Sequence, residues 1–414
     1  MSRNLLPSKG MRDFMPEEKR LREHVMGIIR DEYAKNGFLE IETPVVEDIE
    51  RLIDSDGGEN TKMIFKILKR GEKLDLAADT LKEDDLIDLG LRFDLTLPLS
   101  RFYCNNHNDL PKVFKAMQTG FVFRAERPQR GRFRSFMQCD VDIMGDETNF
   151  SEIELIDVVG KTLNRLDVEG FKVKINDRRL LTDAIVKSGF APEDVTRVCI
   201  SLDKADKIGI DGVRKDLEKQ GFESSSIDNI ITIMENIKNG GLDGAEKSGL
   251  NPEAVSSLRE IMAAVLSMNG GRYGIEFDFT LVRGMGYYTG TIFEVAYGDL
   301  GYSIAGGGRY DNMIGNFMGK HVPAVGFSIG FERLVEILKE RGDGQLDEDH
   351  VALVFESETP AAVIAAGDTL RKTYKTVSAF RREKKFGKQL ERLKKAGYKY
   401  FAVIEGDAPV VKEI

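Results

Sequence analysis

The stretch Phe123-Arg-Ala-Glu-Arg-Pro-Gln-Arg-Gly-Arg-Phe-Arg-Ser-Phe136 carries a clear structural signal. Residues that favour β-strands flank a centre that holds a proline, a glycine and several arginines, which is typical of a hairpin with a strongly cationic loop. Arginines beside an aromatic ring suit a nucleotide, because guanidinium groups bind phosphate and a ring can stack on a base. A phosphorylated protein or an RNA would need the same parts, so the hairpin alone leaves the ligand open.

Polar residues alternate with apolar ones where the second strand of this hairpin continues. In Gln138-Cys-Asp-Val-Asp142 the period of two places the three polar side chains on one face of the expected strand. Such groups are costly on the inner face of a sheet unless they find partners, so they either line a polar pocket or face water. The run Arg92-Phe-Asp-Leu-Thr96 gives a similar pair, Asp94 and Thr96, on one face of another expected strand.

Two further segments combine glycines with residues that bind ligands. Leu281-Val-Arg-Gly-Met-Gly-Tyr-Tyr-Thr-Gly290 suits a binding site, because glycines allow close approach, arginine offers a fixed fork of donors and phenols form hydrogen bonds. A glycine-rich hairpin with half-buried tyrosines is the alternative. Ala305-Gly-Gly-Gly-Arg-Tyr310 adds Arg309 as a candidate phosphate contact. Arg333 lies in the first turn of an expected helix.

Composition limits the class of protein. The 414 residues predict two or three domains, and a formal net charge of -9 argues against binding nucleic acid through overall charge. Residues 371–399 nevertheless hold 12 lysines and arginines and two glutamates, a local net charge of +10. This basic stretch fits either a contact to a phosphate backbone or a solvated surface rich in lysine.

Other classes of protein lack support in the sequence. There is no Walker phosphate loop, no dinucleotide-binding glycine fingerprint and no nucleophile elbow. The three cysteines and four histidines show no spacing typical of a disulfide framework, a metal site or a catalytic triad. We expect a cytoplasmic protein, because the sequence shows neither an apolar leader nor a run long enough to span a membrane.

Periodicity outlines the organisation of the chain. A helix is expected from Pro16 to Gly37, followed by a strand over 38–46 that Pro44 places at an edge. Residues 171–270 are charged, favour helices and contain glycine-rich turns. From 351 onward strands and helices alternate, which predicts a small α/β domain with a mostly parallel sheet.

Taken in order, these segments resemble the motifs of class II aminoacyl-tRNA synthetases, and specifically those of the histidyl-tRNA synthetases. No single motif is specific, but the ordered set of five is, and the similarity covers essentially the full chain. The matching segments are the helix ending at Gly37 with the strand through Pro44 (motif 1), residues 123–136 (motif 2), residues 326–333 (motif 3), and residues 282–290 and 306–311 (the two histidyl-specific motifs).

The resemblance implies an α+β fold in which helices flank an antiparallel sheet of six to seven strands, and it implies a homodimer built through motif 1. The end of the chain looks abbreviated, since typical members continue through a further strand or helix. The implied domains are a first part of the catalytic core at 1–170, a helical insertion at 171–270, a second part of the core at 271–340, a linker at 341–350 and an anticodon-binding α/β domain at 351–414.

The resemblance also implies an enzyme that joins histidine to ATP, forming histidyl-adenylate and pyrophosphate, and then transfers the histidyl group to tRNA. ATP would act with Mg²⁺, and Arg124 and Arg283 would be the catalytic residues, the latter in a place where related synthetases use a metal. Both would stabilise charge that builds on the α-phosphorus. The implied ATP contacts are Arg124, Glu126 at the adenine edge, Phe136 on the ring, Arg309, and Arg333 at the γ-phosphate.

Histidine would be held through its two ends. The implied contacts are Asp94, Leu95, Thr96 and Gln138 at the α-amino group, Asp142, Tyr287 and Tyr288 at the imidazole, together with Arg124 and Arg283. Adjacent strand residues point to opposite faces, so the two tyrosines share a pocket only if Gly286, where many members of the family carry Asp, allows a bend. In the basic stretch, Lys384, Lys385 and Lys388 are the candidate tRNA contacts.

One rival keeps the same fold without the reaction. It is the inactive regulatory paralogue of the synthetases that partners a short ATP phosphoribosyltransferase in histidine biosynthesis, senses histidine and lacks the anticodon domain. Four arginines expected at the nucleotide argue for the enzyme, as does the segment 387–397, which resembles part of an anticodon domain. Those arginines are Arg124, Arg283, Arg309 and Arg333.

Overall fold

The computed structural model describes most of the chain and divides it into two compact units, Met1–Arg341 and Gly342–Ile414. Each unit is described by itself. The described residues are 5–54, 59–71, 74, 82–128, 133–283, 288–298, 303–342, 349–406 and 408–414. None of the helices in these ranges is both long and apolar enough to cross a membrane.

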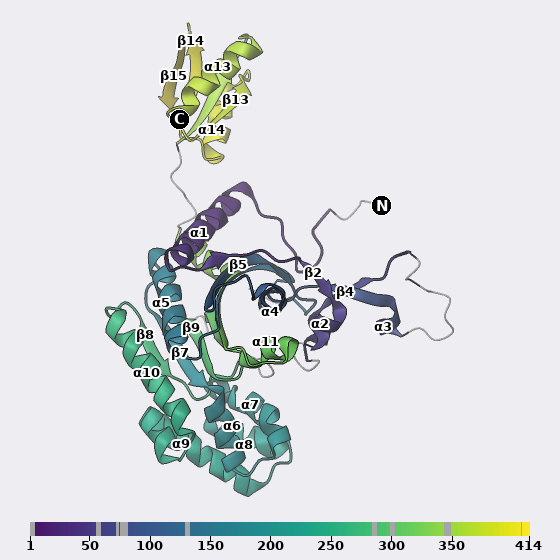
Figure 1. Cartoon of the computed structure of the whole chain (residues 1–414). Coiled ribbons are helices and arrows are strands. Elements are labelled where there is room, and N and C mark those ends of the chain that lie inside the picture. Colours follow the sequence, from purple (N-terminus) through teal and green to yellow (C-terminus); the bar gives the residue numbers. More distant parts are fainter. Residues whose placement is uncertain are drawn as a thin grey trace. The chain divides into compact units, whose positions relative to one another are not determined.

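The first unit is built on an eight-stranded sheet with the strand order β1-β5-β6-β11-β10-β9-β7-β8 (Figure 1). Its centre is antiparallel, but β1 runs parallel to β5 and β8 parallel to β7, so the sheet is larger and less uniform than the expected antiparallel sheet of six to seven strands. The strands are β1 (Leu39–Glu40), β5 (Phe114–Phe123), β6 (Ser135–Met144), β7 (Phe171–Asp177), β8 (Gly274–Phe277), β9 (Thr291–Tyr297), β10 (Ser303–Arg309) and β11 (Ala324–Gly330).

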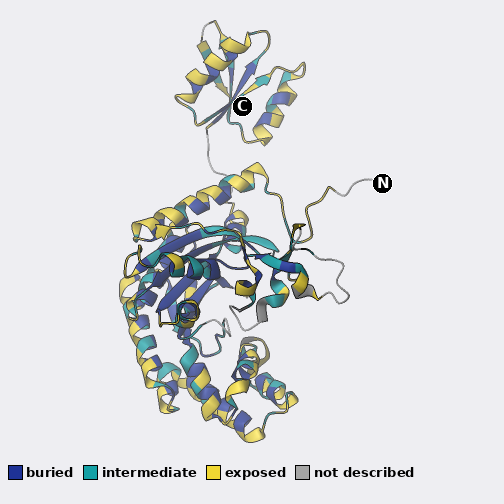
Figure 2. Cartoon of the chain, turned by 45° about the vertical axis from the view of Figure 1, so that its right-hand side comes forward, coloured by how far each residue is buried: buried dark blue, intermediate teal, exposed yellow. Residues whose placement is uncertain are grey.

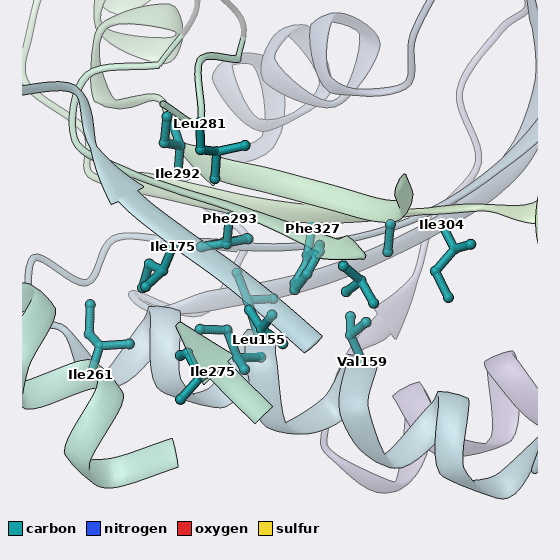
Figure 3. Close-up of a cluster of buried hydrophobic side chains, with 14 of the residues drawn as sticks. Leu155, Val159, Ile175, Ile261, Ile275, Leu281, Ile292, Phe293, Ile304 and Phe327 are labelled. Carbon is teal, nitrogen blue, oxygen red and sulfur yellow. The ribbon is translucent and has the colours of Figure 1, made fainter. Parts of the chain in front are cut away.

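Helices cover one face of this sheet and bury its core. α5 (Phe150–Arg165) packs on β11, and α1 (Pro16–Lys35) packs on α5. Figure 3 shows Leu155 and Val159 of α5 facing sheet residues such as Phe327. α1 begins with Pro16 and two acidic residues and buries apolar side chains at helical spacing. Figure 2 shows buried strands and exposed outer surfaces of the helices.

The region expected to be a helical insertion begins with a strand. Phe171, Val173 and Ile175 alternate with more polar residues and are buried, because β7 pairs with both β8 and β9 in the main sheet. Residues 171–177 of this region are therefore part of the main sheet. The helices that follow connect the parallel strands β7 and β8: α6 (Arg178–Lys187), α7 (Val195–Leu202), α8 (Ala205–Lys219), α9 (Ser224–Lys247) and α10 (Pro252–Met268).

Two expected strands are also corrected. The run 38–46 is interrupted around Pro44, so its ends join different sheets, with β2 in a small sheet of order β2-β4-β3. Residues 92–96 turn into a helix, because Asp94 Oδ1 accepts a hydrogen bond of 3.2 Å from the backbone N–H of Leu97. The elements concerned are β2 (Val46–Asp48), β3 (Phe65–Leu68), β4 (Ile87–Leu91) and α4 (Thr96–Asn106).

The described part of the first unit also contains four short α-helices. They are α2 (Ile49–Asp54), α3 (Glu83–Leu86), α11 (Asp311–Met318) and α12 (Phe331–Glu340). α12 begins directly after the sheet strand β11, as the segment around Arg333 predicted.

The second unit confirms the predicted α/β alternation. Its sheet has the order β13-β12-β14-β15, in which β12 pairs in parallel with β13 and β14. The chain end expected to be abbreviated forms β15, which pairs antiparallel with β14. The elements are β12 (His350–Phe355), α13 (Pro360–Arg371), β13 (Thr376–Arg381), α14 (Phe386–Lys395), β14 (Tyr400–Glu405) and β15 (Ala408–Glu413).

Candidate active site

A cavity of about 710 Å³ lies against the eight-stranded sheet. Its walls come from β6, β9, β10 and β11, from the start of α12 and from the segment before α4. Strand β6 separates this cavity from the apolar core, since Gln138, Asp140 and Asp142 line the cavity whereas Cys139 and Val141 belong to the core. The predicted alternation is therefore confirmed, and the polar face lines a pocket.

One end of the cavity is acidic and phenolic. Asp142 is only 2% exposed, and its Oδ1 accepts a hydrogen bond of 2.6 Å from the hydroxyl of Tyr310. Burial raises the pKa of Asp142 to about 7, with a further increase from the charge of Asp94, although the Tyr310 hydrogen bond opposes the shift. Gly326 leaves room for this carboxylate, since a Cβ there would lie 2.0 Å from Asp142 Oδ1.

A second buried carboxylate lies beside the first. Asp140 is 3% exposed and accepts a hydrogen bond of 2.5 Å from the hydroxyl of Ser328. Burial, together with the charge of Asp142, raises the pKa of Asp140 well above its usual range. Burial also raises the pKa of Tyr288 to about 12, so this phenol stays protonated near neutral pH and can donate a hydrogen bond.

The other end of the cavity is cationic. Arg283 donates from Nε to Glu294 Oε2 at 2.6 Å and from Nη2 to Ser303 Oγ at 2.7 Å. Arg333 donates from Nη1 to the carbonyl oxygen of Ser303, so the two arginines converge on one serine. This end offers guanidinium groups whose positions are fixed by hydrogen bonds before any ligand arrives.

The predicted nucleotide-binding hairpin contributes a third arginine. Arg124 donates from Nε to the carbonyl oxygen of Phe93 at 3.1 Å, and its guanidinium lies 5.1 Å from the centre of the Phe136 ring. Glu126 also lines the cavity. The predicted side chains Arg124, Glu126 and Phe136 thus meet in one place, whereas residues 129–132 of the loop lie outside the described part of the chain.

Not every predicted residue reaches the cavity. Arg309, expected at ATP, instead forms a bidentate ion pair with Glu152 of α5, with both N–O distances at 2.7 Å. Alternation along β10 explains why Arg309 does not reach the cavity. Its side chain points to the opposite face of the sheet from positions 306 and 308. Leu95 is also absent from the lining; it is buried, and its carbonyl oxygen accepts a hydrogen bond of 3.1 Å from Gln118 Nε2.

The remaining predicted residues divide as follows. Asp94 and Thr96 line the cavity near the start of α4, and Tyr288 lines it as well. Tyr287 and Gly286 lie outside the described residues. Lys384, Lys385 and Lys388 are exposed in the second unit.

Several residues of the cavity carry no role predicted from the sequence. Ser328 stands opposite Asp140 in the β6–β11 ladder, a pairing that needs the register of two strands 188 residues apart. Glu332 follows β11 and accepts hydrogen bonds of 2.6 and 2.8 Å from the buried Arg22. Tyr310 and Asp140 lie inside the quoted motifs, and strand alternation placed Asp140 on the polar face of its strand without giving it a role. Glu294 and Ser303 had no signal of their own.

Known proteins provide an independent comparison. The profile of the family described as "Histidyl-tRNA synthetase" matches residues 10–334. The chain is 40% identical over 424 residues to the histidine--tRNA ligase of Leifsonia xyli subsp. xyli (strain CTCB07), covering 99% of this chain and 98% of that protein.

Solved structures agree with this match. The histidyl-tRNA synthetase of Nostoc sp. PCC 7120 superposes with a TM-score of 0.77 at 25% identity, covering 100% of this chain and 97% of that one. A Bacillus halodurans C protein, described as an ATP phosphoribosyltransferase regulatory subunit/histidyl-tRNA synthetase, also gives a TM-score of 0.77. It is 20% identical and covers 98% of this chain and 100% of its own, so it supports the fold alone.

Proposed function

The chain belongs to the family of histidyl-tRNA synthetases and attaches histidine to tRNA, and we propose that the cavity on the eight-stranded sheet is where histidine is activated by ATP. One observation carries the proposal: a single cavity joins an acidic and phenolic end to a cationic end. The first end suits the ammonium and imidazole of histidine, and the second suits the phosphates of ATP. Exchange of pyrophosphate into ATP that depends on histidine is the experiment that tests it.

The acidic end would select the amino acid. Asp142, positioned by Tyr310, and the phenol of Tyr288 would form hydrogen bonds with the two imidazole nitrogens. Asp94, Thr96 and Gln138 would hold the α-amino group. Buried partners of this kind reject side chains that leave them unsatisfied, which provides selectivity without an editing step.

The cationic end would promote the chemistry. A carboxylate oxygen of histidine would attack the α-phosphorus of ATP, and the bond to pyrophosphate would break. Arg124 and Arg283 would then stabilise the negative charge that builds on the phosphoryl oxygens, while Arg333 would meet the γ-phosphate. Phe136 would stack on adenine, with Glu126 at the edge of the base.

Magnesium would enter this site together with ATP. No group of three acidic, histidine or cysteine side chains able to hold a metal ion occurs in the part of the chain that the structure describes. Mg²⁺ in nucleotide sites takes most of its ligands from phosphates and water and needs only one or two carboxylates, so the residues fit an ion carried by the phosphates. Glu294, beside Arg283, is the carboxylate that would contact the ion, which would neutralise phosphate charge.

The closeness of Gly306 to Arg283 yields a prediction. A Cβ at position 306 would lie 2.3 Å from Arg283 Nη1, so Gly306→Ala must displace the guanidinium. We expect adenylate formation to fall about 100-fold, the usual cost of losing one preorganised donor, while histidine still binds. Pyrophosphate exchange and calorimetry measure the two effects.

Gly274→Ala in β8 provides the control, because its Cβ would meet only the Lys172 side chain, at 3.4 Å. Equal activity of the two glycine variants would contradict the proposed place of Arg283.

The second unit is proposed to bind the anticodon region of tRNA, with residues 178–268 as the helical insertion of the catalytic unit. α14 and the residues before it carry the exposed Lys384, Lys385 and Lys388. Positive charge on a small α/β unit of an acidic protein suits a phosphate backbone.

Replacing these three lysines by glutamine is expected to weaken tRNA binding and to reduce its dependence on salt. Each lost contact to a single-stranded phosphate lowers the slope of log K against log salt by about 0.7, so three contacts lower it by about 2. Filter binding at several salt concentrations gives the slope, and pyrophosphate exchange, which needs no tRNA, should stay unchanged. An unchanged affinity and slope would identify the stretch as a solvated surface.

The regulatory paralogue is the second candidate, because it shares the fold and would bind histidine. Two observations favour the enzyme. The similarity extends over 98% of a histidine--tRNA ligase, so it includes the second unit. Three of the four arginines expected at the nucleotide also line one cavity, namely Arg124, Arg283 and Arg333.

Assembly and location complete the proposal. We propose a homodimer built through α1 and β1, which would cover apolar residues such as Leu39 that are exposed on the single chain. Light scattering of the purified protein measures its mass. The cytoplasm, where tRNA is charged in bacteria, is the proposed location.

A further inference from the structure

We infer that Asp140 and Ser328 form a hydrogen-bonded pair that fixes the orientation of the Gln138 carboxamide, so that its carbonyl oxygen faces the cavity to accept a hydrogen bond from the α-ammonium group of the amino acid. Asp140 and Ser328 would thus be positioning residues that act through Gln138. The inference rests on the proposed activation of histidine in this cavity and adds to it the residues that orient one of its contacts.

The pairing of β6 with β11 brings the three side chains together. Asp140 stands directly opposite Ser328, and Gln138 stands opposite Gly330. The Gln138 side chain reaches diagonally across the ladder to Ser328. Gln138 Nε2 donates to Ser328 Oγ at 3.1 Å, and Ser328 Oγ donates to Asp140 Oδ1 at 2.5 Å.

The direction of these hydrogen bonds determines which end of the carboxamide faces Ser328. A serine hydroxyl has one proton, and here that proton is donated to Asp140. Ser328 Oγ can then only accept, so the group of Gln138 that faces it must be the NH₂ group. A neutral Asp140 that carries its proton on Oδ2 still accepts through Oδ1, so the orientation does not require an ionised carboxylate.

The carbonyl end of Gln138 is left for a ligand. Gln138 Oε1 is buried and forms no hydrogen bond within the described part of the chain. A buried acceptor without a partner is costly, and a donor from the ligand would remove that cost. Asp94 and Asp140, both buried in the same cavity, make a cationic donor more favourable than a neutral one.

Reversal of the carboxamide would place an NH₂ group, which is a donor, against the ammonium. The Asp140–Ser328 pair should therefore affect the affinity for ligands that carry the α-amino group and leave the affinity for ligands that lack it unchanged. A residue that served only the stability of the sheet would affect both kinds of ligand.

The test compares histidine with 3-(imidazol-4-yl)propionate, which lacks the α-amino group, by calorimetry on the full chain. In Ser328→Ala the Gln138 carboxamide loses its partner and can reverse. We expect histidine to bind about 10-fold more weakly, which is the effect of losing one hydrogen bond to a charged group. The analogue should bind to this variant as tightly as it binds to the wild-type chain. Asp140→Ala should show the same selective loss, since removal of the acceptor of the serine proton frees that proton for Gln138 Oε1.

Ser328→Thr keeps the hydroxyl and should recover most of the affinity for histidine. An equal loss for both ligands, or no loss for histidine, would overturn the inference while leaving the proposed function intact. A wild-type chain that fails to bind histidine would overturn both.

Discussion

Arg283→Ala is expected to lower the rate of histidyl-adenylate formation by about 10²–10³-fold, the range observed when one preorganised donor to a developing charge is removed. The guanidinium is held by Glu294 and Ser303 before ATP arrives, so its contribution needs no rearrangement during the reaction. Histidine-dependent exchange of pyrophosphate into ATP measures the rate. The affinity for histidine, measured by calorimetry, should remain detectable, because the acidic end of the cavity is unchanged.

Two variants control for indirect effects of this substitution. Arg272→Ala removes a guanidinium whose Nε donates to a backbone carbonyl oxygen, that of Asn269, and should leave exchange at the wild-type rate. Arg283→Lys keeps the charge but not the planar fork of donors and should fall between the wild type and alanine. Exchange at the wild-type rate in Arg283→Ala would remove Arg283 from the chemistry.

Asp142→Asn is expected to reduce kcat/KM for histidine by about 10²–10³-fold, since a polar site built for particular hydrogen bonds discriminates strongly when one partner is wrong. Asparagine keeps an oxygen that can accept from the Tyr310 hydroxyl, so the packing against Gly326 should persist. It replaces the second carboxylate oxygen by an NH₂ group, which cannot accept from an imidazole N–H. Steady-state exchange at varied histidine and ATP measures the two KM values separately.

A rise in KM that is confined to histidine distinguishes a lost histidine contact from a general disruption of the fold. KM for histidine should rise far more than KM for ATP, and Tyr310→Phe, which removes the hydroxyl that positions Asp142, should give a smaller rise. Equal increases in both KM values, or a large fall in the melting temperature of Asp142→Asn, would indicate disruption of the sheet.

The alternation of polar and apolar residues predicted which side chains of a regular strand face the cavity. Alternation placed Gln138 and Asp142 on the cavity side of β6 because that strand is paired over its whole length with β5 and carries a clear apolar face. The same alternation predicted a strand at Asp94, where the chain instead enters α4. In the sequence, a carboxylate that accepts a hydrogen bond at the start of a helix cannot be told from a polar residue of a strand.

Contacts between distant segments were not predictable. Arg309 was predicted as a phosphate contact because it follows three glycines, and its ion pair with Glu152, which lies 157 residues earlier in the chain, could not be foreseen. The hydrogen bonds of Ser328 and the space that Gly306 leaves for Arg283 likewise depend on the register of neighbouring strands. The ordered set of motifs still identified the family. Recognition of a family requires only the residues of each motif and the order of the motifs along the chain, and not the contacts between distant strands.

Exchange of radioactive pyrophosphate into ATP by the purified chain, measured with each amino acid in turn, tests the central claim most directly. The proposed function predicts rapid exchange with histidine and only background exchange with the other amino acids, because only histidine satisfies the acidic end and presents its carboxylate to the arginines. Binding of histidine without any exchange would contradict it and would identify a sensor of histidine in place of an enzyme.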